Sequence, residues 1–167
     1  MKKMLVLVFV GILTLGMSEI AGAIVYEDTE ALSRSLSGNG TTAWYHQTPT
    51  DFEVPYDIVN SATLTVSACG LDKTGARVDV EGVAHGALVN GEWYFLGWSW
   101  SQFDIGDVFV GGWPNGQALN VSLVYNTSVW SIFNSLYLAD SKFTLDYTND
   151  TADPAPVPEP STMLLLG

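Results

Sequence analysis

The chain of 167 residues carries six basic against 18 acidic residues, a net charge of −12, and 47% of its residues are hydrophobic. A field of this sign repels phosphate backbones and anionic headgroups, which argues against nucleic-acid binding and against docking on an acidic membrane surface. Cys69 is the single cysteine and so excludes an intrachain disulfide.

The first 23 residues have the three parts of a secretory signal peptide. Lys2 and Lys3 form a positive n-region, residues 4–15 are apolar, and Ala21-Gly22-Ala23 offers small residues for cleavage. The apolar stretch is shorter than the roughly 20 residues that cross a bilayer. We therefore expect cleavage after Ala23 and a secreted or cell-surface protein. The mature chain then has four basic and 17 acidic residues, a net charge of −13.

Residues 24–149 have the usual length of one domain with one core. Apolar residues recur at every second position in four segments, which predicts half-buried strands at 62–68, 77–81, 119–125 and 142–147. Turn residues occur at 72–75, 90–91 and 114–116. Residues 29–36 are a candidate short helix. About seven to nine strands without crossover helices predict an all-β, antiparallel β-sandwich of jelly-roll or Greek-key type.

The sequence around the two histidines gives little indication of a catalytic role. His46 stands in an aromatic stretch and His85 near an expected hairpin. Neither belongs to an HExxH pair, and the chain has no GxSxG elbow and no glycine-rich loop leading into a helix. A Ser-His-Asp triad can still assemble from distant residues, but a core or surface histidine needs no special arrangement. We therefore expect a protein that is not an enzyme.

Carboxylates occur in close pairs, of which Asp79 with Glu81 is the best candidate for a metal site. Residues two apart on a strand share a face, so this pair would present two oxygen ligands to a hard cation such as Ca²⁺. The other pairs are Asp51 with Glu53 and Asp104 with Asp107. No EF-hand spacing is present, and the acidic residues are scattered. A solvated surface without a cofactor is therefore favoured over calcium binding, and glycosidase chemistry is the least favoured reading.

Aromatic residues crowd into one segment that ends near residue 104. The crowded residues are Trp93, Tyr94, Phe95, Trp98 and Trp100, with Trp113 shortly after. On a strand, Trp98, Trp100, Gln102 and Asp104 would project from one face and combine flat rings with hydrogen-bonding groups. Large aromatic residues also fill the space between two sheets, and this core role is favoured. A sugar-binding surface made of Trp98, Trp100 and Trp113 is the alternative.

Residues 150–160 form a proline-rich linker, expected to be extended, with proline at alternate positions from Pro154 to Pro160. The sequence Val157-Pro158-Glu159-Pro160-Ser161-Thr162, followed by a leucine run, resembles the opening of a PEP-CTERM sorting signal. The resemblance implies recognition of Pro158, Glu159 and Pro160 by an exosortase, a membrane peptidase of bacteria that produce exopolysaccharide.

The complete signal of that family continues through a membrane helix to a cluster of arginines. Residues 161–167 are too few to span a bilayer, so we expect a truncated tail, with transient membrane association only where the missing helix exists. The resemblance implies a non-catalytic cell-surface or extracellular-matrix protein associated with exopolysaccharide or biofilm. A carbohydrate-binding module is the alternative function, and a glycan hydrolase is the third.

Overall fold

The computed structural model describes residues 22–70, 76–90, 97–126 and 135–149. Residues 1–21 of the expected signal peptide, the expected turn at 72–75, Trp93 to Phe95 and the tail from residue 150 lie outside these ranges. Within them the elements are β1 (Ala23–Ser37), β2 (Asn39–His46), β3 (Asp57–Gly70), β4 (Arg77–Val80), β5 (Val83–Ala87), β6 (Ser99–Asp104), the short 3-10 helix η2 (Gly106–Phe109), β7 (Leu119–Asn126) and β8 (Ser135–Asn149). No helix in the described part of the chain is long and apolar enough to cross a membrane.

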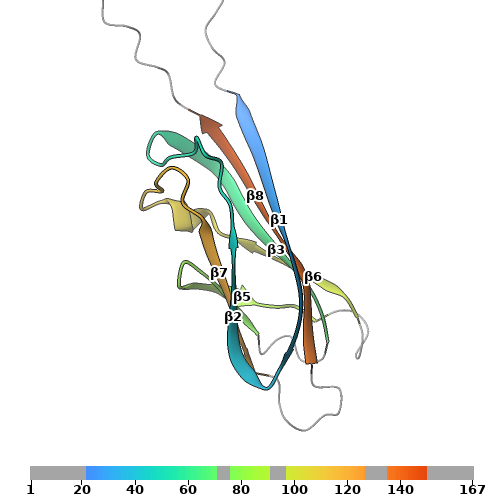
Figure 1. The fold of residues 1–167 in the computed structure, drawn as a ribbon. Helices are drawn as coiled ribbons and strands as arrows, with labels where there is room; N and C mark the ends of the chain where they lie inside the picture. The colour runs from blue at the N-terminus through green and yellow to red at the C-terminus, as the bar shows by residue number, and fades with distance from the viewer. Residues whose placement is uncertain (1–21, 71–75, 91–96, 127–134, 150–167) are drawn as a thin grey trace, which may run out of the picture.

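The strands form two antiparallel sheets of four strands each. The first sheet has the order β1-β8-β3-β6 and the second the order β2-β7-β4-β5. Successive strands cross repeatedly from one sheet to the other, which is the connectivity of a jelly roll. The predicted all-β sandwich is thus confirmed, and of the two topologies left open it is the jelly roll. Figure 1 shows the sheets face to face, with the start of β1 and the end of β8 at the same end of the sandwich.

The core lies between the sheets and follows the predicted alternation. Ala62, Leu64 and Val66 of β3 point inward, as do Leu119, Val121 and Leu123 of β7 and Phe143, Leu145 and Tyr147 of β8, and all are buried. Aromatic rings fill the centre. The ring of Phe52 lies 5.1 Å from that of Tyr147, and Phe109 stacks on Phe143 at 6.2 Å. Such ring pairs add to the burial of apolar area that holds the sheets together.

The candidate helix at residues 29–36 is wrong, because these residues lie within β1. Leu32 and Leu36 are both buried and four residues apart, a spacing that satisfies a helical face and an alternating strand equally. Pairing with β8 decides between them, since Glu30 lies opposite Ser141 and Leu36 opposite Leu136. The strand carries an irregularity after Ala31 and continues.

Gly70 ends β3 at a position that another residue fits poorly. Its φ is 123°, and a Cβ at this position would meet the carbonyl oxygen of Ser135. Gly38 has φ 74° with nothing within 4 Å of a Cβ. We expect Gly70→Ala to lower the free energy of unfolding by about 1–3 kcal/mol, and Gly38→Ala by about 1 kcal/mol. Urea denaturation of both variants measures the difference, and equal losses would contradict the clash at Ser135.

Candidate functional site

Exposed aromatic residues lie on the outer face of the first sheet, along its edge strand β6. Along β6, Trp100, Gln102 and Asp104 are exposed, while Ser99, Ser101 and Phe103 are buried. Trp98, immediately before β6, is 47% exposed, and Trp100 is 65% exposed. The core role favoured from the sequence is therefore wrong for Trp98 and Trp100, and the alternative face with Gln102 and Asp104 points to solvent.

The start of β6 reverses the polarity of an ordinary strand, because Ser99 and Ser101 face the interior and Trp100 faces water, whereas the rest of β6 follows the usual pattern with Phe103 buried. The two serines are satisfied by the segment after β5. The Ser99 hydroxyl donates to the Val89 carbonyl at 2.7 Å, and the Val89 N–H donates to Ser101 Oγ at 2.9 Å. Buried hydroxyl groups that are hydrogen-bonded cost little. The inward serines thus leave both large rings on the outside.

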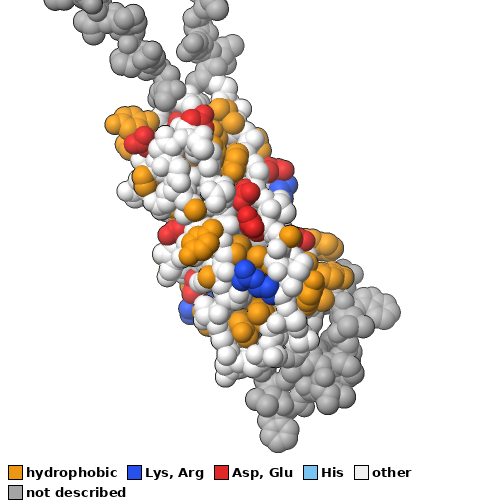
Figure 2. Space-filling view, in the orientation of Figure 1, with side chains coloured by type: hydrophobic (Ala, Val, Ile, Leu, Met, Phe, Trp, Pro, Cys, Tyr) orange, Lys and Arg blue, Asp and Glu red, His pale blue; other side chains and the backbone are white. Residues whose placement is uncertain are grey.

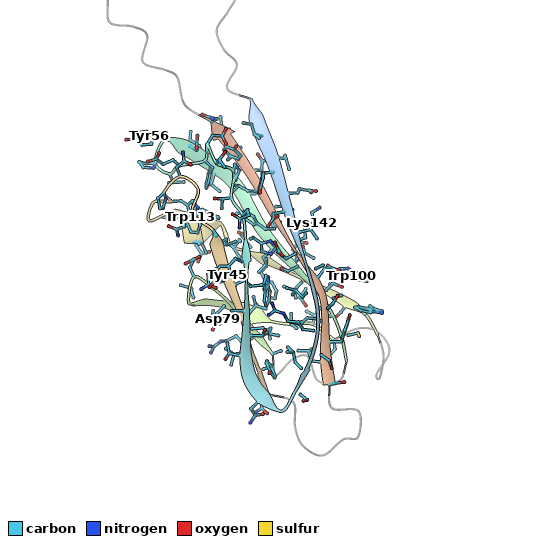
Figure 3. All side chains as sticks on the ribbon, viewed as in Figure 1. Tyr45, Tyr56, Asp79, Trp100, Trp113 and Lys142 are labelled. Carbon is cyan, nitrogen blue, oxygen red and sulfur yellow. The ribbon has the colours of Figure 1, made fainter. Side chains whose placement is uncertain are left out.

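A third ring joins these tryptophans from the neighbouring part of the sheet. Tyr137 of β8 lies opposite Cys69 of β3, and its ring meets that of Trp98 edge to face, with centroids 5.9 Å apart. We call Trp98, Trp100 and Tyr137 the aromatic patch. Figure 2 shows hydrophobic side chains gathered at the edge where Figure 3 places Trp100, with its ring directed away from the sheets.

Hydrogen-bonding side chains continue the same face beside the aromatic patch. The register puts Ser67 between Trp100 and Asp140, and Thr65 between Gln102 and Lys142. The Lys142 ammonium is held by Glu27 at 2.6 Å. Neighbouring strands are about 4.8 Å apart, so these groups lie side by side across the sheet, although Ser67 itself is only 3% exposed.

A groove adjoins the far end of this face, between the start of β3, the end of β6 and η2. Its volume is about 440 Å³, within the range of small-molecule sites. Apolar lining comes from Val54, Val59, Phe109 and Val110. Polar lining comes from Asn60, Ser61, Asp104 and Asp107. The groove therefore combines an apolar wall with carboxylates.

Trp113, the third residue of the predicted sugar-binding surface, lies elsewhere. It is 3% exposed, and its ring packs 4.9 Å from that of Phe109 in the core. The structure brings Trp98 and Trp100 together but separates them from Trp113. Tyr137 takes the third place instead. Its signal in the sequence is its position between Leu136 and Leu138, which are both buried, so that a strand turns Tyr137 outward.

The two carboxylates predicted as metal ligands each have another hydrogen-bond partner. Both oxygens of Asp79 accept from the Arg77 guanidinium, at 2.7 and 2.8 Å, and this hydrogen-bonded carboxylate raises the pKa of Arg77. β4 ends at Val80, so Glu81 lies in a turn with φ 49°, where it accepts from the Asn120 N–H at 2.6 Å. Among the described residues, no group of three or more acidic, histidine or cysteine side chains is arranged to hold a metal ion.

His85, the more exposed of the predicted histidines, sits on β5 beside the groove. Its Nδ1 lies 2.9 Å from the Val83 carbonyl, and its Nε2 lies 3.1 Å from Asp107 Oδ1. Carbonyl and carboxylate oxygens can only accept, so both ring nitrogens face acceptors. One carboxylate of the groove is therefore already engaged by an imidazole, while Asp104 is not.

His46, the other histidine, is fully buried and joins three strands. Its Nδ1 lies 3.0 Å from Asp28 Oδ2 on β1, and its Nε2 lies 2.9 Å from Ser141 Oγ on β8. The carboxylate can only accept, so Nδ1 donates to it and Nε2 accepts from the serine hydroxyl. This is the order of a Ser-His-Asp triad. His46 and Ser141 are both 0% exposed, however, so a substrate has no approach to the serine in this structure.

The His46 network is built to keep the imidazole neutral. Burial lowers the pKa of His46, and the nearby charges of Asp28 and Glu30 oppose this effect without overcoming it. A neutral ring with both nitrogens hydrogen-bonded satisfies the polar groups that the sandwich buries between β1, β2 and β8. The arrangement therefore explains how a histidine can occupy the core.

These observations define the chain as a jelly-roll sandwich with exposed tryptophans on the outer face of one sheet and a groove lined in part by carboxylates beside them. No protein-family model matches the sequence, and no curated protein matches it.

Comparison with solved structures finds matches of low sequence identity. A structure described as FLHE is 10% identical with a TM-score of 0.46, covering 76% of this chain and 98% of the other. A family 35 carbohydrate-binding module from Clostridium thermocellum is 11% identical with a TM-score of 0.36, covering 72% and 90%. The CBM36-1 domain of a xylanase from the hindgut metagenome of Trinervitermes trinervoides is 15% identical with a TM-score of 0.32, covering 74% and 96%.

Proposed function

We propose that this chain is an exported, non-catalytic surface or matrix protein whose sandwich binds extracellular polysaccharide through the aromatic patch. The observation that carries the proposal is the reversed polarity at the start of β6, where Trp100 is 65% exposed and Ser101 is buried. A large apolar side chain exposed where a polar one is expected, with hydrogen bonds that compensate for the buried serines, is typical of a functional surface. Exposed apolar area of this kind marks a binding site.

The chemistry around the aromatic patch suits sugars. A pyranose ring offers C–H groups to an aromatic face and hydroxyl groups to polar neighbours at its edges. The indoles of Trp98 and Trp100 supply the apolar surface, and Gln102 and Thr65 supply donors and acceptors beside them. The exposed side chains of Trp100, Gln102 and Asp104 extend along β6, which suits a polymer rather than a small molecule enclosed in a pocket.

Export and sorting form the second part of the proposal. The signal-peptide pattern of residues 1–23 supports secretion, and the resemblance of Pro158-Glu159-Pro160 to a sorting motif supports processing by an exosortase. A polysaccharide-binding domain fits this destination, because bacteria with such sorting systems produce exopolysaccharide. The absence of a motif for catalysis in the sequence supports binding rather than turnover.

Affinity electrophoresis through gels that contain soluble glucans, xylan, chitosan or alginate tests the proposal. We expect the parent protein to be retarded by at least one polysaccharide, and Trp98→Ala and Trp100→Ala each to weaken binding by roughly thirtyfold, the effect of losing a central aromatic contact.

Tyr45→Ala is the matched control, because Tyr45 is 58% exposed on β2 in the second sheet, away from Trp100 (Figure 3). Retardation that survives both tryptophan substitutions, or that Tyr45→Ala abolishes equally, would contradict the proposal.

A further inference from the structure

The aromatic patch and the groove lie on one continuous line along β6. Trp100 and Asp104 are four residues apart on the same face of the strand, which is about 13 Å at about 3.3 Å per residue. Asp104 also lines the groove. A single extended ligand that stacks on the aromatic patch therefore reaches the groove without leaving the sheet face.

Asp104 is a positioned carboxylate at the mouth of the groove. Its Oδ1 accepts from the Gly106 N–H at 3.0 Å, which orients the carboxylate on the turn into η2. The neighbouring Asp107 is engaged by His85. Apolar side chains such as Val59 and Phe109 line the same groove. An apolar wall lowers the local dielectric and strengthens the attraction between a carboxylate and a cation.

The charges of the outer face have one dominant sign. Glu27, Asp104 and Asp140 are acidic, and the basic side chain among the described residues of this face is Lys142, which Glu27 already holds. Polysaccharides that carry uronate or sulfate groups meet repulsion on such a surface, whereas positive groups are attracted.

We propose that the ligand is a polysaccharide with free amino groups, bound with its sugar rings on the aromatic patch and an ammonium group against Asp104 in the groove. This assignment rests on the proposed function and names its ligand class. The aromatic patch provides contacts common to many sugars, and the Asp104 carboxylate selects among them. A charged hydrogen bond of this kind corresponds to about a tenfold preference or more over the acetylated sugar, which carries no charge.

Chitosan and fully acetylated chitin oligomers of equal length provide the test, because they share one backbone and differ in the free amine. Binding is measured by titration calorimetry at a pH where the amine is protonated, for the full mature chain and three variants. We expect the parent to prefer chitosan oligomers by about tenfold, and Asp104→Asn to remove that preference while retaining binding of the acetylated oligomers. Trp100→Ala should weaken both.

Glu81→Gln is the matched control for net charge, since it removes one negative charge from the turn between β4 and β5 in the second sheet. Loss of preference in Glu81→Gln equal to that in Asp104→Asn would overturn the assignment, because it would show attraction to the whole acidic protein. Equal affinity of the parent for both oligomers would also overturn it. If Trp100→Ala still weakens binding in those cases, the proposed function stands; if it does not, the proposed function fails as well.

Discussion

Phe143→Ala is expected to cost about 3–5 kcal/mol of unfolding free energy, the range for removing a large aromatic side chain from a packed core. Phe143 is 0% exposed at the centre of β8. Its ring contacts Tyr26 at 6.5 Å, His46 at 6.0 Å and Phe109 at 6.2 Å, so the substitution opens a cavity that residues of both sheets line. The total free energy of unfolding of a domain of this size is about 5–15 kcal/mol. The variant is therefore expected to be marginally stable or unfolded at room temperature.

Urea denaturation followed by tryptophan fluorescence measures this loss. Tyr45→Ala provides the comparison, because Tyr45 is 58% exposed and its removal should change stability by no more than about 0.5 kcal/mol. A loss below about 1 kcal/mol for Phe143→Ala would mean that the space between the sheets collapses around the deletion, in contradiction to a rigid aromatic core.

Most of this fold could be predicted because alternation survives in the strands of the core. In β3, Leu64 and Val66 face inward between threonines that face outward. In β7, Leu119 and Val121 also face inward. The strand at residues 29–36 is harder to predict from the sequence, because the polar Arg34 lies between the buried Leu32 and Leu36. The Arg34 guanidinium donates to Thr42 and to the Ala43 carbonyl on β2. These hydrogen bonds stabilise a charged group at the edge of the sandwich, and no local sequence pattern predicts them.

The candidate site could be predicted only in part, and β6 shows why. Alternation places Trp98 and Trp100 on one side of a strand, but composition favours burying tryptophan and exposing serine. Two hydrogen bonds reverse that preference, since Ser99 donates to the Val89 carbonyl and Ser101 accepts from the Val89 N–H. The turn residues at 90–91 predict a reversal of the chain after Val89, but they do not predict that Val89 pairs with these serines. Trp113 follows the aromatic segment closely in sequence, which predicts the same surface, whereas its isolated bridge to Val54 and its packing on Phe109 of η2 hold its ring in the core.

The His46 network also lay beyond sequence reasoning, because its members are far apart along the chain. Asp28 and Ser141 precede and follow His46 by 18 and 95 residues. Only the crossing of β1 and β8 over β2 brings them together. This separation along the chain makes the network informative about folding, because the network forms only when the two sheets have packed together.

Acidification is expected to destabilise the protein through His46. The folded protein holds the pKa of His46 below its ordinary value of about 6.5, because the buried ring resists a charge. The unfolded chain therefore binds a proton near pH 6 that the folded chain does not. The free energy of unfolding then falls as pH drops from about 6.5 toward the folded-state pKa, and it is unaffected by His46 above that window. Each unit of lowering contributes about 1.4 kcal/mol.

Urea denaturation at a series of pH values separates this effect from the titration of the many carboxylates. His46→Gln should flatten the slope of unfolding free energy against pH as the pH falls below about 6.5. Ser141→Ala offers a milder variant. It removes the donor to Nε2 that favours the neutral ring, so it should raise the pKa of His46 and shrink the same slope. A slope that stays the same in His46→Gln and Ser141→Ala would mean that other groups cause the acid sensitivity, and that the buried imidazole does not resist protonation.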